Sequence, residues 1–272
     1  MAVKLLMLVI FFAIMVSVGI YARKHATSVD GYVLGGRSVG PWLTAFAYGT
    51  SYFSAVVFVG YAGQFGWKYG LASTWIGIGN AIIGSLLAWV VLGRRTKVMT
   101  QHLNSKTMPD FFGERYGSKA LKITASAIVF IFLVPYTASV YNGLSRLFGM
   151  AFNIPYKYCV IGMAVFTGIY VILGGYMATA INDFIQGIIM LGGIVAVILA
   201  VLNGQGGFIQ AIKTMAEIPS DVPVTMGQPG AFTSFFGPDP LNLLGVVILT
   251  SLGTWGLPQM VGKFYAIKDE KS

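Results

Sequence analysis

Charged side chains are scarce in this sequence. Lys, Arg, Asp and Glu make up 10% of its 272 residues, against roughly 25% in soluble domains. There is one cysteine and there are two histidines, so neither an internal disulfide nor a zinc or redox cluster can be assembled. The apolar runs described below hold no histidine or glutamate to serve as the base of a buried nucleophile. These absences argue against an enzyme.

Apolar residues and glycine take the place of the missing charge. Hydrophobic residues make up 56% of the chain and 35 residues are glycine, which is nearly double the usual share of about 7%. A water-soluble fold cannot hide so much apolar surface, whereas membrane helices use glycine to bring their backbones together. The sequence therefore predicts an all-α, polytopic membrane protein.

Seven runs are long enough to cross a hydrocarbon core of about 30 Å. They are Leu5–Tyr21, Trp42–Gly66, Leu71–Gly93, Ile123–Met150, Tyr158–Tyr176, Phe184–Leu202 and Leu241–Tyr265. We interpret the first as a spanning helix, because it is long for a signal peptide and lacks a small-residue cleavage site. No linker or low-complexity tract divides the chain, so residues 1–272 are expected to form one integral domain or part of one.

The net charge of +9 raises the alternative of nucleic-acid binding, but the basic residues lie in separate short loops. With the N-terminus outside, thirteen of the eighteen Lys and Arg residues fall on the cytoplasmic side, among them Arg37, Lys97 and Lys263. Only five, including Arg146 and Lys157, remain outside. The positive-inside rule thus predicts an external N-terminus and a cytoplasmic C-terminus.

Two loops are long enough to carry structure. In the cytoplasmic loop, Thr107 is placed to cap a helix whose dipole favours Asp110 in its first turn. The external loop at 203–240 holds five of the ten prolines and a short amphipathic piece around Phe208–Ala216. We expect it to be an ordered cap or lid.

Polar residues inside apolar runs are costly in a membrane unless they pair or line a cavity. The second run has hydroxyl residues clustered at Thr50–Ser54, directly after Gly49. One interpretation is local unwinding; the other is a regular helix whose hydroxyls bond back to their own carbonyls. The residues alone leave these two open.

The last run is interrupted by Thr250, Thr254 and Pro258. Proline cannot donate to the carbonyl four residues back, and an exposed carbonyl in lipid costs several kcal/mol. The pattern predicts a helix break at Gly253–Pro258 lining a protected cavity, with a simple kink as the alternative. Pro135 frees the carbonyl of Ile131 in the fourth run in the same way, and there we expect a kink.

Asp183 adjoins a membrane run, in an Asn182-Asp183-Phe184 sequence. It is interpreted either as a helix N-cap or as a carboxylate on a cation path. Interrupted helices also build channel filters, so an ion channel or membrane sensor is the alternative class to a transporter.

A set of motifs in a fixed order resembles the sodium/solute symporter family, which includes proline, pantothenate, sialic acid and sugar cotransporters. The motifs are Tyr32–Pro41, Thr107–Asp110 with Arg115–Gly117, Gly174–Tyr176, Asp183–Gln186, and Gly256–Pro258 with Lys263–Phe264. The resemblance implies a leucine-transporter-type inverted-repeat fold. On that map the chain supplies a peripheral helix (1–22), the first five-helix repeat (42–202), an extracellular loop (203–240) and the first helix of the second repeat (241–265), with the C-terminal half missing.

The resemblance also implies sodium-coupled symport of a small organic solute by alternating access at the cell membrane, with sodium as the coupling ion and no other cofactor. Sodium would be held by the backbone carbonyls of Thr50 and Phe53 and by Asp183. Substrate contacts would come from Ser51, Tyr52, Ser54, Tyr136, Thr250, Thr254, Trp255 and Pro258.

The implied substrate is an amino acid such as proline, with pantothenate or another carboxylate as the alternative. The sequence departs from the proline transporters at three of the implied contacts. Those transporters have an acidic residue in place of Tyr52, a tryptophan in place of Thr250 and a tyrosine in place of Thr254.

Overall fold

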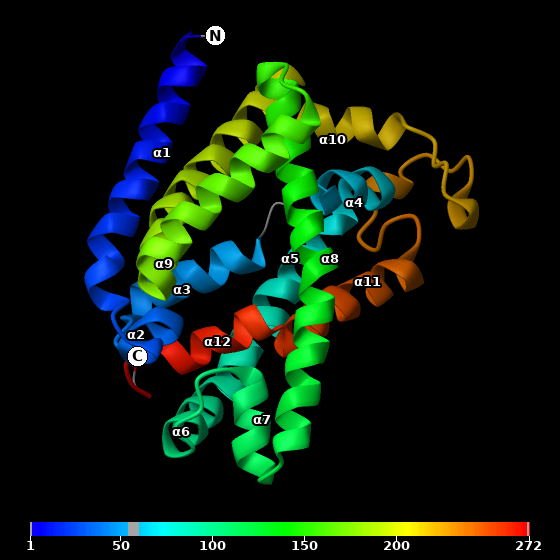
Figure 1. The fold of residues 1–272 in the computed structure, drawn as a ribbon. Coiled ribbons are helices and arrows are strands. Elements are labelled where there is room, and N and C mark those ends of the chain that lie inside the picture. The colour runs from blue at the N-terminus through cyan, green and yellow to red at the C-terminus, as the bar shows by residue number, and fades with distance from the viewer. Residues whose placement is uncertain (1, 54–59, 271) are drawn as a thin grey trace. The chain divides into compact units, whose positions relative to one another are not determined.

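The computed structural model describes residues 2–53, 60–270 and 272, and over these residues the chain is helical (Figure 1). The helices are α1 (Ala2–Ala22), α2 (Val29–Leu34), α3 (Pro41–Tyr52), α4 (Ala62–Tyr69), α5 (Thr74–Gly79), α6 (Arg94–His102), α7 (Met108–Tyr116), α8 (Lys119–Phe152), α9 (Tyr156–Gly204), α10 (Phe208–Glu217), α11 (Pro240–Gly253) and α12 (Pro258–Ala266). Extended pairing in the described part is limited to an isolated bridge between Val39 and Ile267. The predicted all-α class is confirmed.

Four helical segments are long and apolar enough to cross a membrane: Ala2–His25, Ala62–His102, Lys119–Phe152 and Tyr156–Gly204. A fifth is obtained when Pro240–Gly256 and Pro258–Ala266 are counted as one interrupted span. The chain is therefore a multi-pass membrane protein. The run Trp42–Gly66 crosses the undescribed residues 54–59, so the count of seven spans stays a prediction.

Glycines interrupt two of these long segments. Gly70 (φ 59°, ψ −137°) ends α4, and Gly175 (φ 55°, ψ −145°) breaks the helical conformation inside α9. Residues with a side chain rarely adopt such a backbone. The break at Gly175 accounts for the two runs Tyr158–Tyr176 and Phe184–Leu202, which the sequence separates and which α9 joins without a loop.

The chain divides into two compact units. The first holds Met1–Val59, Leu92–Gly187 and Pro258–Ser272, and the second holds Gly60–Val91 and Ile188–Leu257. In the first unit, helices meet at glycines: an added Cβ on Gly19 would lie 3.2 Å from Tyr170 Cα, and one on Gly187 would lie 2.5 Å from Phe46 Cδ1. Such small residues bring α1 and α3 close to α9.

The second unit is organised around a small apolar core of Tyr69, Ala72, Ile76 and Leu243. Helix α5 is followed directly by a π-helical segment, η5 (Asn80–Leu87), which contacts α11. This conformation is rare and often found at functional sites. The expected amphipathic piece of the 203–240 loop, which the sequence predicts to be external, is α10, and the buried Phe232 anchors the loop further along. The loop is ordered, as predicted.

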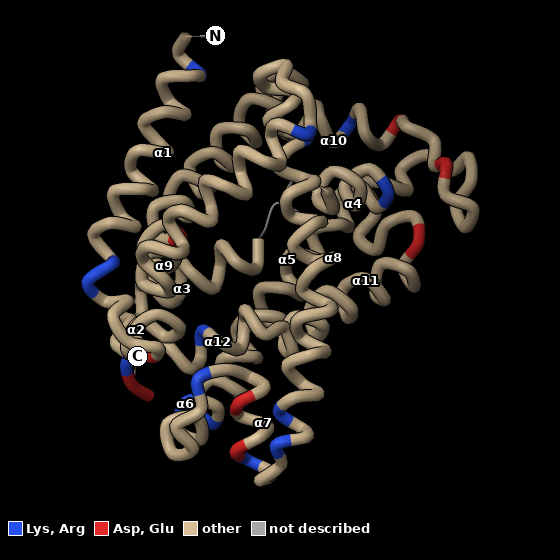
Figure 2. Tube along the Cα trace, in the orientation of Figure 1, with Lys and Arg blue, Asp and Glu red and all other residues tan. Residues whose placement is uncertain are grey.

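Basic residues gather around α6, α7 and the start of α8, while α8 and α9 have long uncharged stretches (Figure 2). The predicted helix start is confirmed there. The Thr107 hydroxyl accepts the Asp110 N–H (3.3 Å), and the Asp110 carboxylate accepts the Lys106 N–H (2.9 Å). This is a reciprocal cap of the kind that satisfies two unpaired donors.

The Asp110 carboxylate should make this end of the protein sensitive to acid. Burial raises the pKa of Asp110, but the hydrogen bonds and charges of Lys122 and Lys106 outweigh it and hold the pKa below its usual range. A carboxyl with a lowered folded-state pKa contributes stability above its unfolded pKa, and this is lost as pH falls through the folded pKa. We expect thermal melting of the wild type to fall between pH 5 and pH 3 more steeply than that of Asp110→Asn. Equal slopes would contradict this.

Candidate functional site

The end of α3 carries three of the residues to which the sequence assigns a sodium or substrate contact. Thr50, Ser51 and Tyr52 are helical, so of the two interpretations of Thr50–Ser54 the regular helix holds for these three residues and local unwinding does not. The reason is that the Thr50 hydroxyl donates back to the Phe46 carbonyl (2.9 Å) and the Phe53 N–H donates to the Gly49 carbonyl (2.8 Å), which completes the last turn. The helix does end here, because Phe53 (φ −86°, ψ 58°) is non-helical.

Asp183 lies in the interior of α9, eight residues after the break at Gly175, so it is not the N-cap of that helix. Its carboxylate lies 3.5 Å from the ammonium of Lys263 on α12. Both side chains are largely buried, with 23% and 8% of their surfaces exposed. The Thr50 side chain also interacts with this carboxylate. The structure thus places Asp183 beside the side chain of Thr50, whereas the predicted ligand at Thr50 is its backbone carbonyl, and adds the cation of Lys263.

Several polar groups near this ion pair are buried without partners among the described residues. They are the Tyr176 hydroxyl and both amide atoms of Asn182 and of Gln259. Tyr176 lies under the Lys263 ammonium, 5.1 Å from nitrogen to ring centroid. Buried polar groups are nearly always hydrogen-bonded, and those inside membrane helices usually mark a path for ions or substrates.

Lys263 is a residue that the sequence analysis missed. It was counted among the cytoplasmic basic residues because it lies two residues before the end of the last apolar run, Leu241–Tyr265. Its position in the sequence could have indicated a buried role. Lys263 is the sixth residue of α12, about one and a half turns after Pro258, and therefore lies inside the interrupted span.

Lys97 and Arg37 are likewise structural and not simply loop charges. The Lys97 ammonium is buried and donates to the carbonyls of Tyr265 (3.2 Å) and Ile267. Arg37 follows two glycines, and all three residues have positive φ (60°, 66° and 54°). This turn allows Arg37 to donate to the Ser105 carbonyl at 2.6 Å. Both side chains therefore fix segments on the predicted cytoplasmic side of the first unit.

In the second unit, polar side chains of α11 and η9 (Thr254–Gly256) form an internal network. The Ser251 hydroxyl donates to the Asn80 amide oxygen (3.2 Å), and the Trp255 indole donates to the Ile83 carbonyl (3.0 Å). The hydroxyls of Thr250 and Thr254 donate to backbone carbonyls one turn earlier. The predicted substrate contacts Thr250, Thr254 and Trp255 therefore share one unit with the π-helical segment.

The predicted break in the last run is confirmed. Helix α11 ends at Gly253, η9 tightens the chain, and Leu257 is extended (φ −71°, ψ 125°) before Pro258 starts α12. Of the other predicted contacts, Tyr136 is half-buried on α8, Ser51 is half-buried and Tyr52 is buried, while Ser54 lies outside the described residues. Pro135 lies within α8, which continues through it.

Spanning helices interrupted within their apolar runs, together with paired ionisable groups inside them, are the organisation of membrane transport proteins. The chain belongs to the sodium:solute symporter family, whose model matches residues 32–272. Sodium/proline symporters of Staphylococcus aureus, for example from strains JH9 and COL, are 34% identical to it over 277 residues. That match covers 98% of this chain and 50% of each relative. The chain thus spans about half the length of the curated relatives it matches.

Proposed function

We propose that the chain is the N-terminal part of a sodium-coupled symporter that takes up a small organic solute by alternating access, with proline as the first candidate. The family membership supports the coupling ion and the mode of transport. The cluster of half-buried Thr50 and Asp183 with buried Lys263 supports a cation site within the first unit. Proline is favoured because it is named in the curated relatives. The three departures at Tyr52, Thr250 and Thr254 suit a solute with different polar groups, which keeps pantothenate or another carboxylate as the alternative.

The arrangement of the chain follows the same proposal. Residues 1–22 form a peripheral helix, 42–202 the first inverted repeat, 203–240 an extracellular loop and 241–265 the first helix of the second repeat. The N-terminus lies outside and the C-terminal end of this chain lies in the cytoplasm. The remaining half, of which the relatives have a counterpart, supplies the rest of the second repeat and the opposing scaffold that alternating access requires.

Uptake of a labelled panel by the full-length protein tests the function. The panel holds proline, other amino acids, pantothenate and short carboxylic acids, with sodium or choline as the external cation. Sodium-dependent, saturable uptake of one member supports the proposal and names the solute. Uptake that is independent of sodium and indifferent to the panel points to a channel instead.

Variants at Thr50 distinguish sodium binding by the backbone carbonyl from sodium binding by the side-chain hydroxyl. Its hydroxyl already donates to the Phe46 carbonyl, so Thr50→Ala should weaken sodium coupling by only a few-fold. Thr50→Pro removes the N–H that bonds to Phe46 and costs the helix about 3 kcal/mol or more; it should abolish coupling, as should Phe53→Pro. Sodium dependence of uptake measures both. Complete loss of coupling in a well-folded Thr50→Ala would mean that the hydroxyl itself is the ligand.

A further inference from the structure

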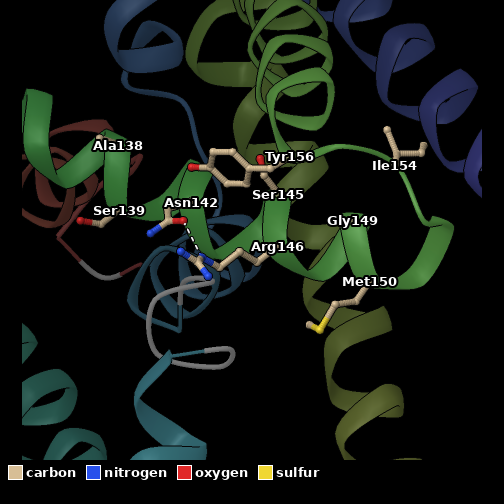
Figure 3. A pocket seen from close by; sticks show the side chains of 9 residues that line it. All are labelled: Ala138, Ser139, Asn142, Ser145, Arg146, Gly149, Met150, Ile154 and Tyr156. Carbon is tan, nitrogen blue, oxygen red and sulfur yellow. Dashed lines mark hydrogen bonds between the residues drawn. The ribbon is translucent and has the colours of Figure 1, made fainter.

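A pocket of about 950 Å³ lies in the first unit between the last third of α8 and the start of α9 (Figure 3). Its lining includes Ser139, Asn142, Ser145, Arg146, Met150 and Tyr156. Four of these are polar residues along one face of α8, and Tyr156 comes from the first turn of α9. Ser139 connects the pocket to the preceding turn of α8, because its hydroxyl donates to the Pro135 carbonyl.

Among the described residues that line this pocket, Arg146 is the one cation. Its Nε donates to the Asn142 amide oxygen one turn earlier, at 2.9 Å. Both side chains are exposed, and the bond orients Nε toward the helix, so that the other N–H groups of the guanidinium are accessible from the pocket. An arginine fork held in this way is suited to bind a carboxylate through two parallel hydrogen bonds.

The neutral groups of the pocket complement that cation. The Ser139 hydroxyl donates to the Pro135 carbonyl at 2.9 Å, so its oxygen lone pairs face outward as acceptors, for example for an ammonium group. A single cation surrounded by hydroxyls and an amide fits a small solute with one carboxylate. A phospholipid headgroup is usually held by a cluster of basic residues, and the volume falls in the range of small-molecule sites.

The pocket also lies on the same helix as a predicted substrate contact. Arg146 is ten residues beyond Tyr136 on α8, which is roughly 15 Å along the helix axis. By the charge distribution this is toward the external end. We propose that the Arg146 pocket is an outer binding site for the carboxylate of the transported solute, which it holds before the solute reaches the polar site deeper in the membrane. This inference rests on the proposed function for the identity of the solute.

The test compares Arg146→Gln and Arg146→Lys with the wild type in the full-length protein, with Lys157→Gln as a control. Lys157 is exposed, lies at the same end of α9 and does not line the pocket, so it matches the loss of charge. For sodium-driven uptake, Arg146→Gln should raise the half-saturating solute concentration about tenfold, the loss expected for one charged hydrogen-bonded contact. The maximal rate should stay the same, Arg146→Lys should restore part of the affinity, and Lys157→Gln should have no effect.

An uncharged amide analogue of the solute gives the sharper readout. The wild type should prefer the carboxylate over the amide, and Arg146→Gln should lose most of this preference. Unchanged half-saturation in Arg146→Gln while the wild type transports would overturn the outer site. So would an effect that appears in anionic phospholipid vesicles and vanishes in phosphatidylcholine, because the pocket would then hold a headgroup.

Equilibrium binding of labelled proline and pantothenate to the purified protein in sodium-free buffer separates this inference from the proposed function. Arg146-dependent binding without any sodium-driven uptake would retain the carboxylate site and reject the symport. Sodium-driven uptake together with solute binding that does not change in Arg146→Gln would retain the symport and reject the carboxylate site.

Discussion

Replacing Lys263 with methionine should destabilise the protein strongly and make its stability depend on sodium. The change leaves the Asp183 carboxylate largely buried with no cation beside it, which costs about 3–5 kcal/mol when one partner of such a pair is removed. If the carboxylate faces a cation path, sodium restores the missing charge. Sodium present at 100 times its dissociation constant returns about 2.7 kcal/mol. The melting midpoint of the purified protein, followed against sodium chloride or choline chloride, measures both effects.

Lys268→Met is the matched control, because Lys268 is exposed and lies five residues further along the chain. It should melt like the wild type in both salts. Asp183→Asn completes a double-mutant cycle: combined with Lys263→Met it should cost less than the sum of the single changes. Equal stabilisation of Lys263→Met by sodium and by choline would show that Asp183 has a structural role only.

The sequence predicted the helical membrane class and the break in the last run, because these follow from composition and proline. It predicted that break correctly at Gly253–Pro258, where proline physically prevents a continuous helix. At Thr50–Ser54 it left unwinding and a regular helix open, since hydroxyl residues permit unwinding but do not impose it. At Thr50 the hydroxyl reinforces the helix by bonding to Phe46, and of the described residues in this stretch Phe53 departs from the helix.

The partners of the candidate site could not be predicted in the same way. Asp183 and Lys263 are 80 residues apart, and a lysine at the end of an apolar run is usually a topological signal. The partners of Lys97 are also distant in the sequence, since the carbonyls that it contacts lie about 170 residues away. Periodicity assigns a residue to a helix face, but the residue on the opposing helix depends on tertiary packing. The Arg146 pocket is similar, since it needs Tyr156 from the next helix.

Gly175→Ala should disrupt the first unit more than its size suggests. Gly175 has φ 55° and ψ −145°, and a backbone held in such a glycine-only region costs about 1–3 kcal/mol for a residue with a side chain. The new Cβ would also lie 2.7 Å from the Tyr32 carbonyl oxygen. That atom is backbone and cannot rotate away, so α2 and α9 must separate. Gly168→Ala in the same helix has open space around it and should be neutral or stabilise the helix by up to about 1 kcal/mol.

The consequence should extend to the ion pair, because the break at Gly175 sets the direction in which α9 continues to Asp183. An alanine that favours a regular helix at this point moves the Asp183 carboxylate away from Lys263 and Thr50. We therefore expect Gly175→Ala to lower the melting midpoint and to abolish sodium-dependent uptake at every solute concentration. A variant that melts early but keeps normal sodium-dependent uptake would contradict this link. It would show that the contact between Gly175 and Tyr32 stabilises the fold without positioning the cation site.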